Sequence, residues 1–514
     1  MTTMTLPVPT LKASFTPSYC RRVGAGALLA ALADFLFYGQ PVGITVFIFA
    51  VLLAAAVVAM HPAALSNGRV WLKPVAQYAA HLPLVENVSP LSVTVAVAAL
   101  AMFALSFAGR LRSIPARIAR QLWLFLLSAP FRFAFDFFRW RKAARALGRR
   151  RIRLAAIAVW VMPLTLGLVF LALFGAANPI IEHWLSLIDL YALLKQIEIG
   201  RVAFWLIVLV GVWAYLRPRL PRFAARRRRA LPAAPARPAK AEDILFGKAA
   251  ILRALIVFNA LFALQTGLDA TYLWGGAALP DGMTYAAYAH RGAYPLIVTA
   301  LLAAGFVLAA LKHGSETSGD PLIRRLVYLW VAQNIVLVVS SMLRLDLYID
   351  VYALTYLRIA AFIWMGLVAA GLALIIARIA LAKSGEWLLS ANLLTLSATL
   401  YACCFVNFAA TIANFNVDHS LEMTGSGTPL DARYLRSFGA VAMPALDRFY
   451  THKFGVLTTY LADQLMIDNY LAEQKQWRAW SFRGWRLSKV LDNRGPLVLP
   501  PAQQPSQPAM PSDR

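Results

Sequence analysis

The sequence predicts an all-α protein: a polytopic transmembrane bundle of about eleven helical spans, followed by a small, mostly helical C-terminal tail. The first observation is composition, because 60% of the 514 residues are hydrophobic and 14% are charged, with a mean hydropathy of +0.62, whereas soluble domains are roughly a quarter charged. The second is that apolar stretches are continuous and near the roughly 20 residues that a span needs. Helices are therefore expected, because open sheet edges leave backbone groups unsatisfied in lipid and barrels show alternating segments of about ten residues.

Residues 1–109 are expected to form the N-terminal membrane spans. Lys12, Arg21 and Arg22 precede the first apolar stretch, and no small-residue cleavage site follows at a suitable distance, so an uncleaved first span is predicted. The weakest candidate contains Lys73 and His81 within its apolar residues. The spans predicted in this region are 23–38, 42–60, 70–84 and 90–107.

Residues 110–151 are predicted to be a basic cytoplasmic segment at the membrane interface. Thirteen Lys or Arg and one acid, Asp136, fall between Arg110 and Arg153. The apolar piece inside it, 122–138, is interrupted by Pro130 and Arg132. A crossing here would leave basic residues outside, which the positive-inside rule disfavours, so an interfacial helix is the better interpretation.

Residues 152–216 are predicted to hold two spans, 152–174 and 201–216, with an amphipathic segment at 178–199 on the outer surface. Residues 217–243 then form a basic, Ala/Pro-rich stretch with nine Lys or Arg between 217 and 240, including the run 226–229. This composition is typical of a disordered cytoplasmic linker.

Residues 244–418 are predicted to form a C-terminal membrane bundle, with spans at 244–268, 294–311, 326–342, 352–380 and 388–411. Residues 419–495 are expected to be a small helical tail outside the membrane, and the Pro/Gln-rich residues 496–514 to be disordered. Eleven spans and both arginine-rich segments inside place the N-terminus in the cytoplasm and the C-terminus outside. The net charge of +26 then indicates anionic lipid as the partner, and not nucleic acid.

Polar side chains gather toward the outer ends of the later spans. Gln333, Ser340 and Arg344 share one helical face, and Asn407, Asn414 and Asp418 share another, by their spacing. Ionisable residues within spans usually face the bundle interior or water, so an outward-facing polar cavity is predicted. Its candidate residues are Asp269, Tyr285, Tyr288, Gln333, Arg344, Asp346, Asp350, Arg358, Asn407, Asn414 and Asp418.

Each of these residues also has a structural interpretation. Amides and hydroxyls between spans often form interhelical hydrogen bonds worth about 1 kcal/mol, and Tyr285 and Tyr288 could simply anchor at the interface. Arg358, expected about two turns inside its span, needs a partner, for which Asp346 or Asp350 in the preceding loop is expected.

Sites with recognisable chemistry are not predicted. The sequence has no phosphate-binding loop, zinc-protease helix or nucleophile elbow. Cys20, Cys403 and Cys404 have no metal or redox spacing, and the histidines are scattered singly. No catalytic residue, cofactor or metal site is therefore predicted.

Three stretches of the second half, 252–276, 279–302 and 340–365, resemble a family of bacterial multi-span proteins catalogued as domain of unknown function 4173. The similar motifs are Tyr285, Tyr288 and Gly292 in a Tyr-x-x-Tyr-x-x-x-Gly pattern, and the tyrosine-rich LYID-x-Y-x-LT-x-LR pattern. The resemblance implies a bacterial plasma-membrane location, and it transfers no catalytic residue.

Three functions fit these observations. The first is a membrane module that binds or moves a small solute or lipid through the outward-facing polar cavity. The second is a non-enzymatic scaffold or sensor whose outer tail meets an envelope protein. The third is a membrane enzyme, which would need an acid–base pair such as Asp346 and Asp350; nothing else in the sequence supports it.

Overall fold

The computed structural model describes residues 17–62, 72–111, 115–146, 154–177, 198–219, 248–275, 298, 302, 320–455 and 461–494. These residues are helical apart from turns and one isolated bridge between Ser420 and Thr428, so the all-α prediction is confirmed. The chain divides into two compact units. The first comprises Met1–Leu84, Val93–Leu111 and Ile118–Ala224, and the second comprises Val85–Ser92, Arg112–Arg117 and Ala225–Arg514.

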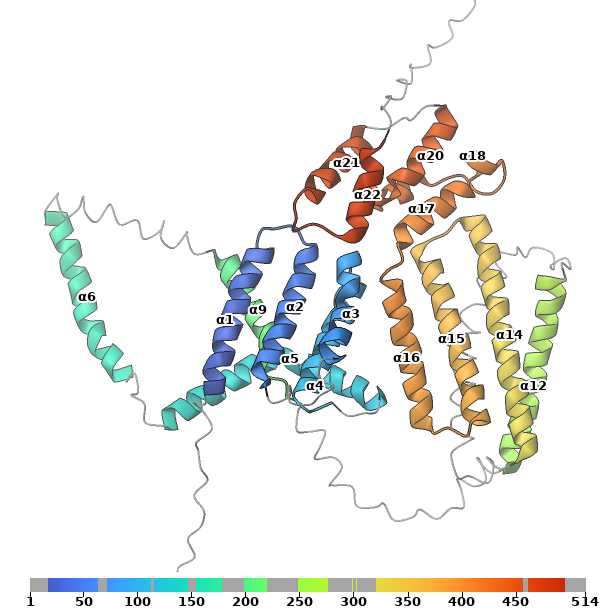
Figure 1. Cartoon of the computed structure of the whole chain (residues 1–514), viewed down its shortest axis with the longest axis horizontal. Helices are drawn as coiled ribbons and strands as arrows, with labels where there is room; N and C mark the ends of the chain where they lie inside the picture. The colour runs from blue at the N-terminus through green and yellow to red at the C-terminus, as the bar shows by residue number, and fades with distance from the viewer. Residues whose placement is uncertain are drawn as a thin grey trace, which may run out of the picture. The chain divides into compact units, whose positions relative to one another are not determined.

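The first unit is built on α1, which packs against α2 and α9 (Figure 1). Its core contains Leu53 and Val57 of α2, Phe103 of α4 and Leu216 of α9, all buried. The helices with residues in this unit are α1 (Pro17–Phe37), α2 (Ile44–Met60), α3 (Leu72–Glu86), α4 (Pro90–Phe107), α5 (Pro115–Ala146), α6 (Leu154–Ala177) and α9 (Ile199–Leu216).

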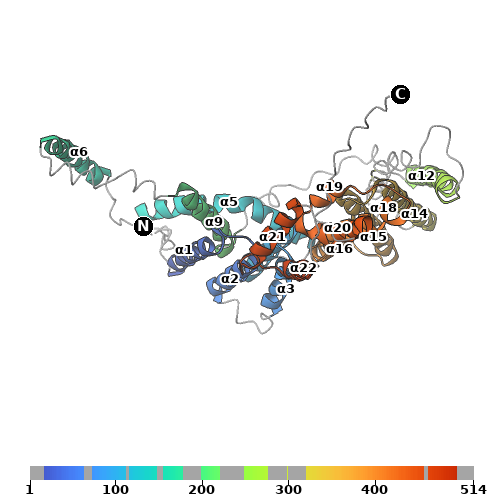
Figure 2. The ribbon, with the colours of Figure 1, turned by 90° about the horizontal axis from the view of Figure 1, so that it is seen from above.

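Helix α5 is a single helix that contains the interfacial piece expected at 122–138. It runs crosswise to α1 in two perpendicular views (Figures 1 and 2). Its Phe125 is fully buried and contacts the ring of Tyr215, at a centroid distance of 5.6 Å. Many of its other large side chains are exposed, including Trp123 and Phe135. Helix α5 therefore packs apolar side chains against the core and leaves an aromatic surface exposed; its place at a membrane interface stays a prediction.

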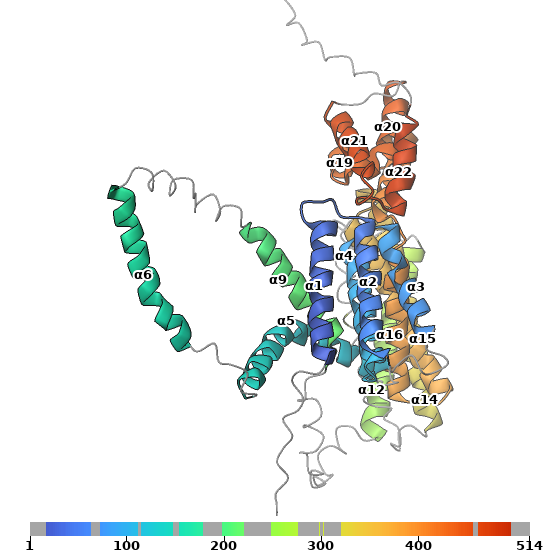
Figure 3. The ribbon, with the colours of Figure 1, turned by 60° about the vertical axis from the view of Figure 1, so that its left-hand side comes forward.

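The second unit contains a layer of long helices, in which α12 packs against α14, α14 against α15 and α15 against α16 (Figures 1 and 3). These are α12 (Lys248–Asp269), continued by a π-helical turn η2 (Ala270–Trp274), α14 (Pro321–Tyr352), α15 (Tyr356–Ala380) and α16 (Gly385–Cys403). Asn259 of α12 lies beside Leu326 of α14, and Asp269 lies beside Arg344. Residue numbers rise together along both helices, so α12 and α14 run parallel.

Shorter helices form a subdomain at one end of this layer (Figures 1 and 3). Its core includes Ile412, Leu435, Leu446 and Phe449, all buried. Its elements are α17 (Phe408–Asp418), α18 (Leu421–Thr424), α19 (Ala432–Arg436), a 3₁₀ turn η4 (Gly439–Ala442), α20 (Met443–Phe454), α21 (Leu461–Gln474) and α22 (Phe482–Asp492).

Within the second unit, α22 is held by charged contacts. The guanidinium of Arg483 lies 3.2 Å from the carboxylate of Glu86 and donates to the carbonyl of Cys404 at 3.1 Å. Arg486 reaches the same carboxylate at 2.5 Å. The Glu86 side chain is 8% exposed, so two arginines stabilise one buried acid.

The predicted number of spans is not confirmed. Five described helices are long and apolar enough to cross a membrane: Pro90–Phe107, Ile199–Leu216, Lys248–Tyr272, Pro321–Tyr352 and Tyr356–Ala380. The bent pair α16 and α17 makes a sixth if the two helices count as one span. Helices α2 and α3, with 17 and 15 residues, are shorter than the roughly 20 residues that a span needs.

The last predicted span, 388–411, is not one straight helix. Helices α16 and α17 are bent by 69° relative to each other. Asn407 ends the continuity because its side chain caps α17, accepting a hydrogen bond from the N–H of Ala410 at 3.3 Å. An N-cap residue has non-helical backbone angles, so the polar face expected from Asn407 to Asp418 belongs to a new helix.

The loop expected after 342 is instead the last part of α14, which continues to Tyr352. Only Ala353–Thr355 separate it from α15. Arg358 therefore lies in the first turn of α15, and not two turns inside a span. The amphipathic segment expected at 178–199, the span expected at 294–311 and the linker at 217–243 lie largely outside the described residues.

Candidate functional site

Two of the candidate residues form a buried ion pair between α12 and α14. The guanidinium of Arg344 contacts the carboxylate of Asp269, and their side chains are 4% and 1% exposed. The same carboxylate accepts the hydroxyl of Ser340 at 2.5 Å and the amide of Gln265 at 2.9 Å. The sequence placed Asp269 and Arg344 together in an outward-facing polar cavity, whereas the structure encloses them between two helices.

Gln333 lies in the same helix pair, nearer the start of α14. Its amide donates to the carbonyl of Asn259 at 3.3 Å, and Asn259 donates to the carbonyl of Leu326 at 3.2 Å. These contacts join α12 to α14, so Gln333 serves as an interhelical contact.

Arg358 does not pair with either expected aspartate. Its guanidinium donates to the carbonyls of Tyr352 and Ala353, and it lies 4.7 Å from the ring centroid of Tyr348. Asp346 and Asp350 are both exposed on the last turns of α14. The prediction was wrong because α14 is longer than expected, which places the free carbonyls at its C-terminus next to Arg358.

A cavity of about 600 Å³ lies where α14 and α15 meet the C-terminal subdomain. Its walls come from the end of α14, the turn at Ala353–Thr355, α17, and the loop that runs from Thr424 to Tyr434. We call it the turn pocket. Its lining residues are Ile349, Asp350, Tyr352, Ala353, Leu354, Thr355, Phe415, Asn416, His419, Thr424, Ser426, Gly427, Thr428, Pro429, Leu430, Asp431 and Tyr434.

Asn416 of α17 holds the inner wall of the turn pocket. Its side-chain oxygen accepts the N–H of Leu354 at 2.7 Å, and its side-chain amide donates to the carbonyl of Leu354 at 3.0 Å. Ala353 beside it has a φ of 62° and a ψ of 172°, a conformation essentially restricted to glycine. A strained alanine held by a buried amide is a feature found at binding sites more often than elsewhere.

The outer wall is a loop rich in glycine and hydroxyl groups. Gly425 and Gly427 have φ values of 75° and 96°, which only glycine adopts at low cost. The N–H of Leu421 bonds to the carbonyl of Thr428 at 3.0 Å, and the carboxylate of Glu422 accepts the N–H of Leu430 at 3.1 Å. These bonds give the loop a defined shape against α17.

The carboxylates in the lining of the turn pocket make its surface acidic. Asp350 and Asp431 contribute carboxylates, and no Lys or Arg belongs to its lining. Asp431 also caps α19 by accepting the N–H of Tyr434 at 2.9 Å. His419 is stacked on Phe415 at a centroid distance of 4.1 Å. Carboxylates, hydroxyls and aromatic faces suit neutral or cationic polar ligands.

Several candidate residues lie elsewhere. Asn414 and Asp418 contact Arg448 of α20, at 2.9 and 3.1 Å, which the sequence reasoning did not anticipate. Asn407 caps α17. Tyr285 and Tyr288 lie outside the described residues. Of the candidate residues that the structure describes, Asp350 alone belongs to the lining of the turn pocket.

Sequence reasoning missed Asn416 and the loop 424–428. Asn416 lies between Asn414 and Asp418 on a different face of α17, so a search for one polar stripe passes over it. The Thr-Gly-Ser-Gly-Thr run does signal a loop that needs left-handed backbone conformations. Nothing in the sequence indicates that this loop packs against the turn after α14.

Among the described residues, no group of three His, Cys, Asp or Glu side chains is arranged to hold a metal ion. The fold and the pocket define a class: an all-helical protein with several apolar helices compatible with membrane insertion, and a polar pocket at the end of its second helical layer.

The chain belongs to a family described as Domain of unknown function (DUF4153), whose model matches residues 75–449. This finding corrects the resemblance to domain of unknown function 4173, since the two are different families. The tyrosine-rich stretches that suggested it are distinctive by eye, yet aromatic residues near span ends are common in membrane proteins generally. No curated protein and no solved structure matches the chain.

Proposed function

We propose that this protein is a multi-pass membrane protein that binds a small polar solute in the turn pocket. The observation that carries the proposal is the pocket itself: a cavity of about 600 Å³, within the roughly 300–1,000 Å³ range of small-molecule sites. It is lined by a strained alanine, a buried asparagine and a hydroxyl-rich loop. We also propose that the bound solute passes across the membrane.

The pocket chemistry favours a neutral or cationic solute, such as a polyol, sugar or amine. Asp350 and Asp431 would receive hydroxyl or ammonium donors, and the rings of Tyr434 and Phe415 offer faces for apolar or cationic groups. An anion would meet two carboxylates without a compensating Lys or Arg in the lining, so anionic substrates are disfavoured.

We also propose that the turn pocket faces outward in a plasma membrane, with the N-terminus in the cytoplasm and the C-terminal helices outside. The opposite end of the second helical layer is basic. It carries Arg324 and Arg325 at the start of α14, and Arg378 and Lys383 at the end of α15. Basic residues at span ends favour the cytoplasmic side.

The parallel course of α12 and α14 supports a larger number of spans than six. Both helices begin at the basic end of the layer, so the chain must return between them. The span predicted at 294–311 falls in that interval, outside the described residues. A return crossing would account for the geometry.

The binding proposal is tested with the purified full-length chain in detergent. Thermal unfolding is measured with a panel of polyols, sugars and amines, for the wild type and for Ser426→Trp, which adds a bulky side chain at an exposed residue of the turn-pocket lining. Thr451→Trp is the matched control, because Thr451 is exposed on α20 outside the lining. A ligand that stabilises the wild type and Thr451→Trp but not Ser426→Trp supports the proposal.

A ligand shift retained in Ser426→Trp would place binding elsewhere, and a panel without any shift would count against a solute site. Asp350→Asn refines the chemistry: amines should lose at least tenfold in affinity and neutral polyols less. Movement is measured separately by uptake of the identified ligand into proteoliposomes.

The orientation is tested by cysteine labelling in intact cells, with the native cysteines replaced by serine. Ser426→Cys should react with an impermeant maleimide, and Lys383→Cys, exposed at the basic end, should react only after permeabilisation. The reverse pattern would invert the proposed topology.

A second function, a non-enzymatic envelope scaffold or sensor, is favoured by one observation. Helices α21 and α22 and the turn between them expose large side chains: Leu465, Trp477, Phe482 and Trp485 are 55, 50, 41 and 39% exposed. Aromatic clusters of this kind are typical of protein interfaces. Retention of one partner after detergent extraction, lost in Trp485→Ala and kept in Thr451→Ala, would support this function over solute binding.

A further inference from the structure

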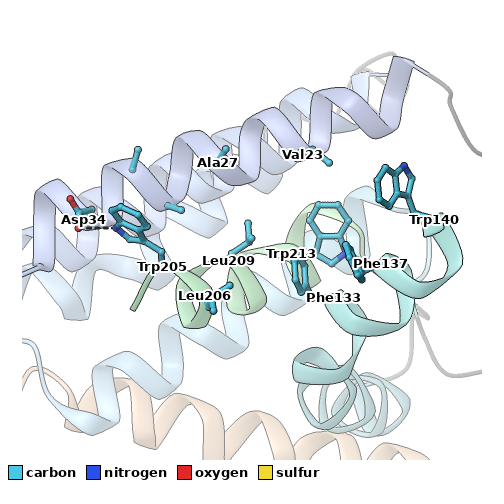
Figure 4. A pocket seen from close by; sticks show the side chains of 12 residues that line it. Val23, Ala27, Asp34, Phe133, Phe137, Trp140, Trp205, Leu206, Leu209 and Trp213 are labelled. Carbon is cyan, nitrogen blue, oxygen red and sulfur yellow. Dashed lines mark hydrogen bonds between the residues drawn. The ribbon is translucent and has the colours of Figure 1, made fainter. Parts of the chain in front are cut away.

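A second cavity of about 600 Å³ lies entirely within the first unit, between α1, α5 and α9. Figure 4 shows the small side chains of α1 along one wall, the leucines of α9 along the other, and aromatic rings of α5 and α9 gathered at one end. We call it the α1–α9 groove. Its lining is Val23, Ala27, Ala30, Ala31, Asp34, Phe133, Phe137, Trp140, Trp205, Leu206, Leu209 and Trp213.

One end of the groove is closed by a carboxylate that already has partners. Asp34 accepts two hydrogen bonds from Arg201, at 2.9 and 2.6 Å, and one from the indole of Trp205 at 2.9 Å. The groove is otherwise lined by alanine, leucine, valine and aromatic residues. Its open space therefore suits an apolar occupant.

The length of the groove matches one leaflet of a bilayer. Val23 and Asp34 lie at its two ends on α1, and the helical rise of 1.5 Å per residue separates them by about 16 Å. Half of the roughly 30 Å hydrocarbon thickness is about 15 Å. The groove therefore has the length of the acyl chains in one leaflet.

Arginines flank the other end of the groove in the sequence. Arg21 and Arg22 directly precede Val23, and Arg217 and Arg219 follow the end of α9. One carboxylate, Asp136 of α5, lies 3.0 Å from Arg217 and 3.4 Å from Arg219. We call these four arginines the α1–α9 arginine cluster; one aspartate leaves it strongly positive.

Burial is the main cause that lowers the pKa of Arg22, and repulsion by Arg217 and Arg21 lowers this pKa further. Burial, followed by repulsion from Arg217, likewise lowers the pKa of Arg219. The Nε of Arg22 is buried and has no hydrogen-bond partner among the described residues. An additional anion at this place would relieve the repulsion and offer that donor an acceptor.

We infer that the α1–α9 groove binds one acyl chain of an anionic phospholipid, whose phosphate lies at the α1–α9 arginine cluster. The charge of the arginine cluster selects an anionic headgroup, and the length and lining of the groove select a single chain from one leaflet. The proposed orientation places the N-terminus, and with it Arg21 and Arg22, on the cytoplasmic side. The lipid therefore comes from the inner leaflet. The site is separate from the turn pocket and belongs to the other unit.

The test uses the full-length protein, delipidated in detergent and supplied with phosphatidylglycerol or phosphatidylcholine of the same acyl composition. Retained lipid is counted by native mass spectrometry, and thermal stability is recorded in parallel. The expected result is one tightly retained phosphatidylglycerol per chain, with at least tenfold weaker retention of phosphatidylcholine.

Two groove-filling variants, Ala30→Phe and the milder Ala27→Leu, should each lose this retained lipid. Leu28→Phe is the matched control, because Leu28 lies on the same helix, is 71% exposed and is not part of the groove lining. Arg22→Gln with Arg219→Gln should abolish the preference for phosphatidylglycerol, whereas Arg433→Gln in the other unit should not.

Equal retention of the two lipids, or unchanged retention in both groove-filling variants, would overturn the inference. A helix or a second copy in the groove would overturn it too. With the native cysteines replaced by serine, an intramolecular disulfide between cysteines at Ala30 and Leu166 would reveal α6 as the occupant. In the same background, a disulfide-linked dimer of the variant with a cysteine at Ala30 alone would reveal a second copy.

Discussion

The buried pair between Asp269 and Arg344 allows a test of how dry the second helical layer is. Asp269→Asn keeps the size of the side chain and the acceptor for Ser340, but it leaves the guanidinium of Arg344 without a countercharge. Both side chains are at most 4% exposed. Removing one partner of a buried pair costs about 3–5 kcal/mol, because an uncompensated charge stays in a low-dielectric site.

This cost should be visible as a fall in melting temperature. One kcal/mol shifts the Tm of a unit of about 200 residues by roughly 2–4 °C, so Asp269→Asn should lower it by roughly 6–20 °C. The assay is thermal unfolding of the detergent-purified chain, followed by size-exclusion fluorescence. Ser340→Ala is the control, since it removes one hydrogen bond to the same carboxylate, worth about 1 kcal/mol.

The double variant Asp269→Asn with Arg344→Gln completes the cycle. A neutral amide pair removes both charges, so the double variant should be less destabilised than the sum of the two single variants by at least 2 kcal/mol. A fall of less than about 2 °C in Asp269→Asn would refute the reasoning. It would show that water reaches the pair, as in the polar cavity expected from the sequence.

Three further predictions follow from the turn pocket and the start of α14. Asn416→Ala should cost about 2–4 kcal/mol, because it leaves the N–H and the carbonyl of Leu354 without partners; chemical denaturation measures this, and a cost below 1 kcal/mol would contradict it. Ala353→Gly should stabilise the protein by about 1 kcal/mol, because glycine adopts the φ of 62° without strain; a lower Tm than wild type would show that alanine is unstrained there. Lys248, followed by the backbone N–H groups at the start of α14, lowers the pKa of Asp320. The ionised cap therefore stabilises the fold above the unfolded-state pKa of about 4, and this contribution is lost as pH falls through the lower folded value. Asp320→Asn should flatten the loss of stability between pH 5 and 2; an unchanged pH profile would rule out this cap as its source.

The sequence predicted well those features that depend on local physics. Continuous apolar stretches predicted helices, and the starts of α4 and α9 agree within two residues with the predicted spans at 90–107 and 201–216. Helical backbone bonding is local, and apolar length is a direct property of the chain. The predictions failed at element ends. Asn407 caps a new helix, and α14 extends through the residues expected as a loop.

The candidate site shows the same division. Asp269 and Arg344 could be assigned to the same level of the bundle from the sequence, because each lies next to the end of its predicted span. The helical rise per residue sets the depth of a residue along its span. The partner of Arg358 could not, since its contacts with the carbonyls of Tyr352 and Ala353 depend on where α14 ends. The contacts of Arg448 with Asn414 and Asp418 could not be predicted either. Arg448 lies on a different helix, so no helical period in the sequence links it to these two residues.

By itself, the sequence determined the class of the protein: apolar helices of membrane-spanning length, with arginines concentrated in particular connecting segments. Those are properties of composition and period, and each holds whatever the neighbours are. The tertiary structure alone decided which side chains meet. Asn416 reaches Leu354 from another helix, and Ala30 and Leu206 line the same α1–α9 groove. Packing brings these distant segments together, and no local pattern in the sequence records the distance between them.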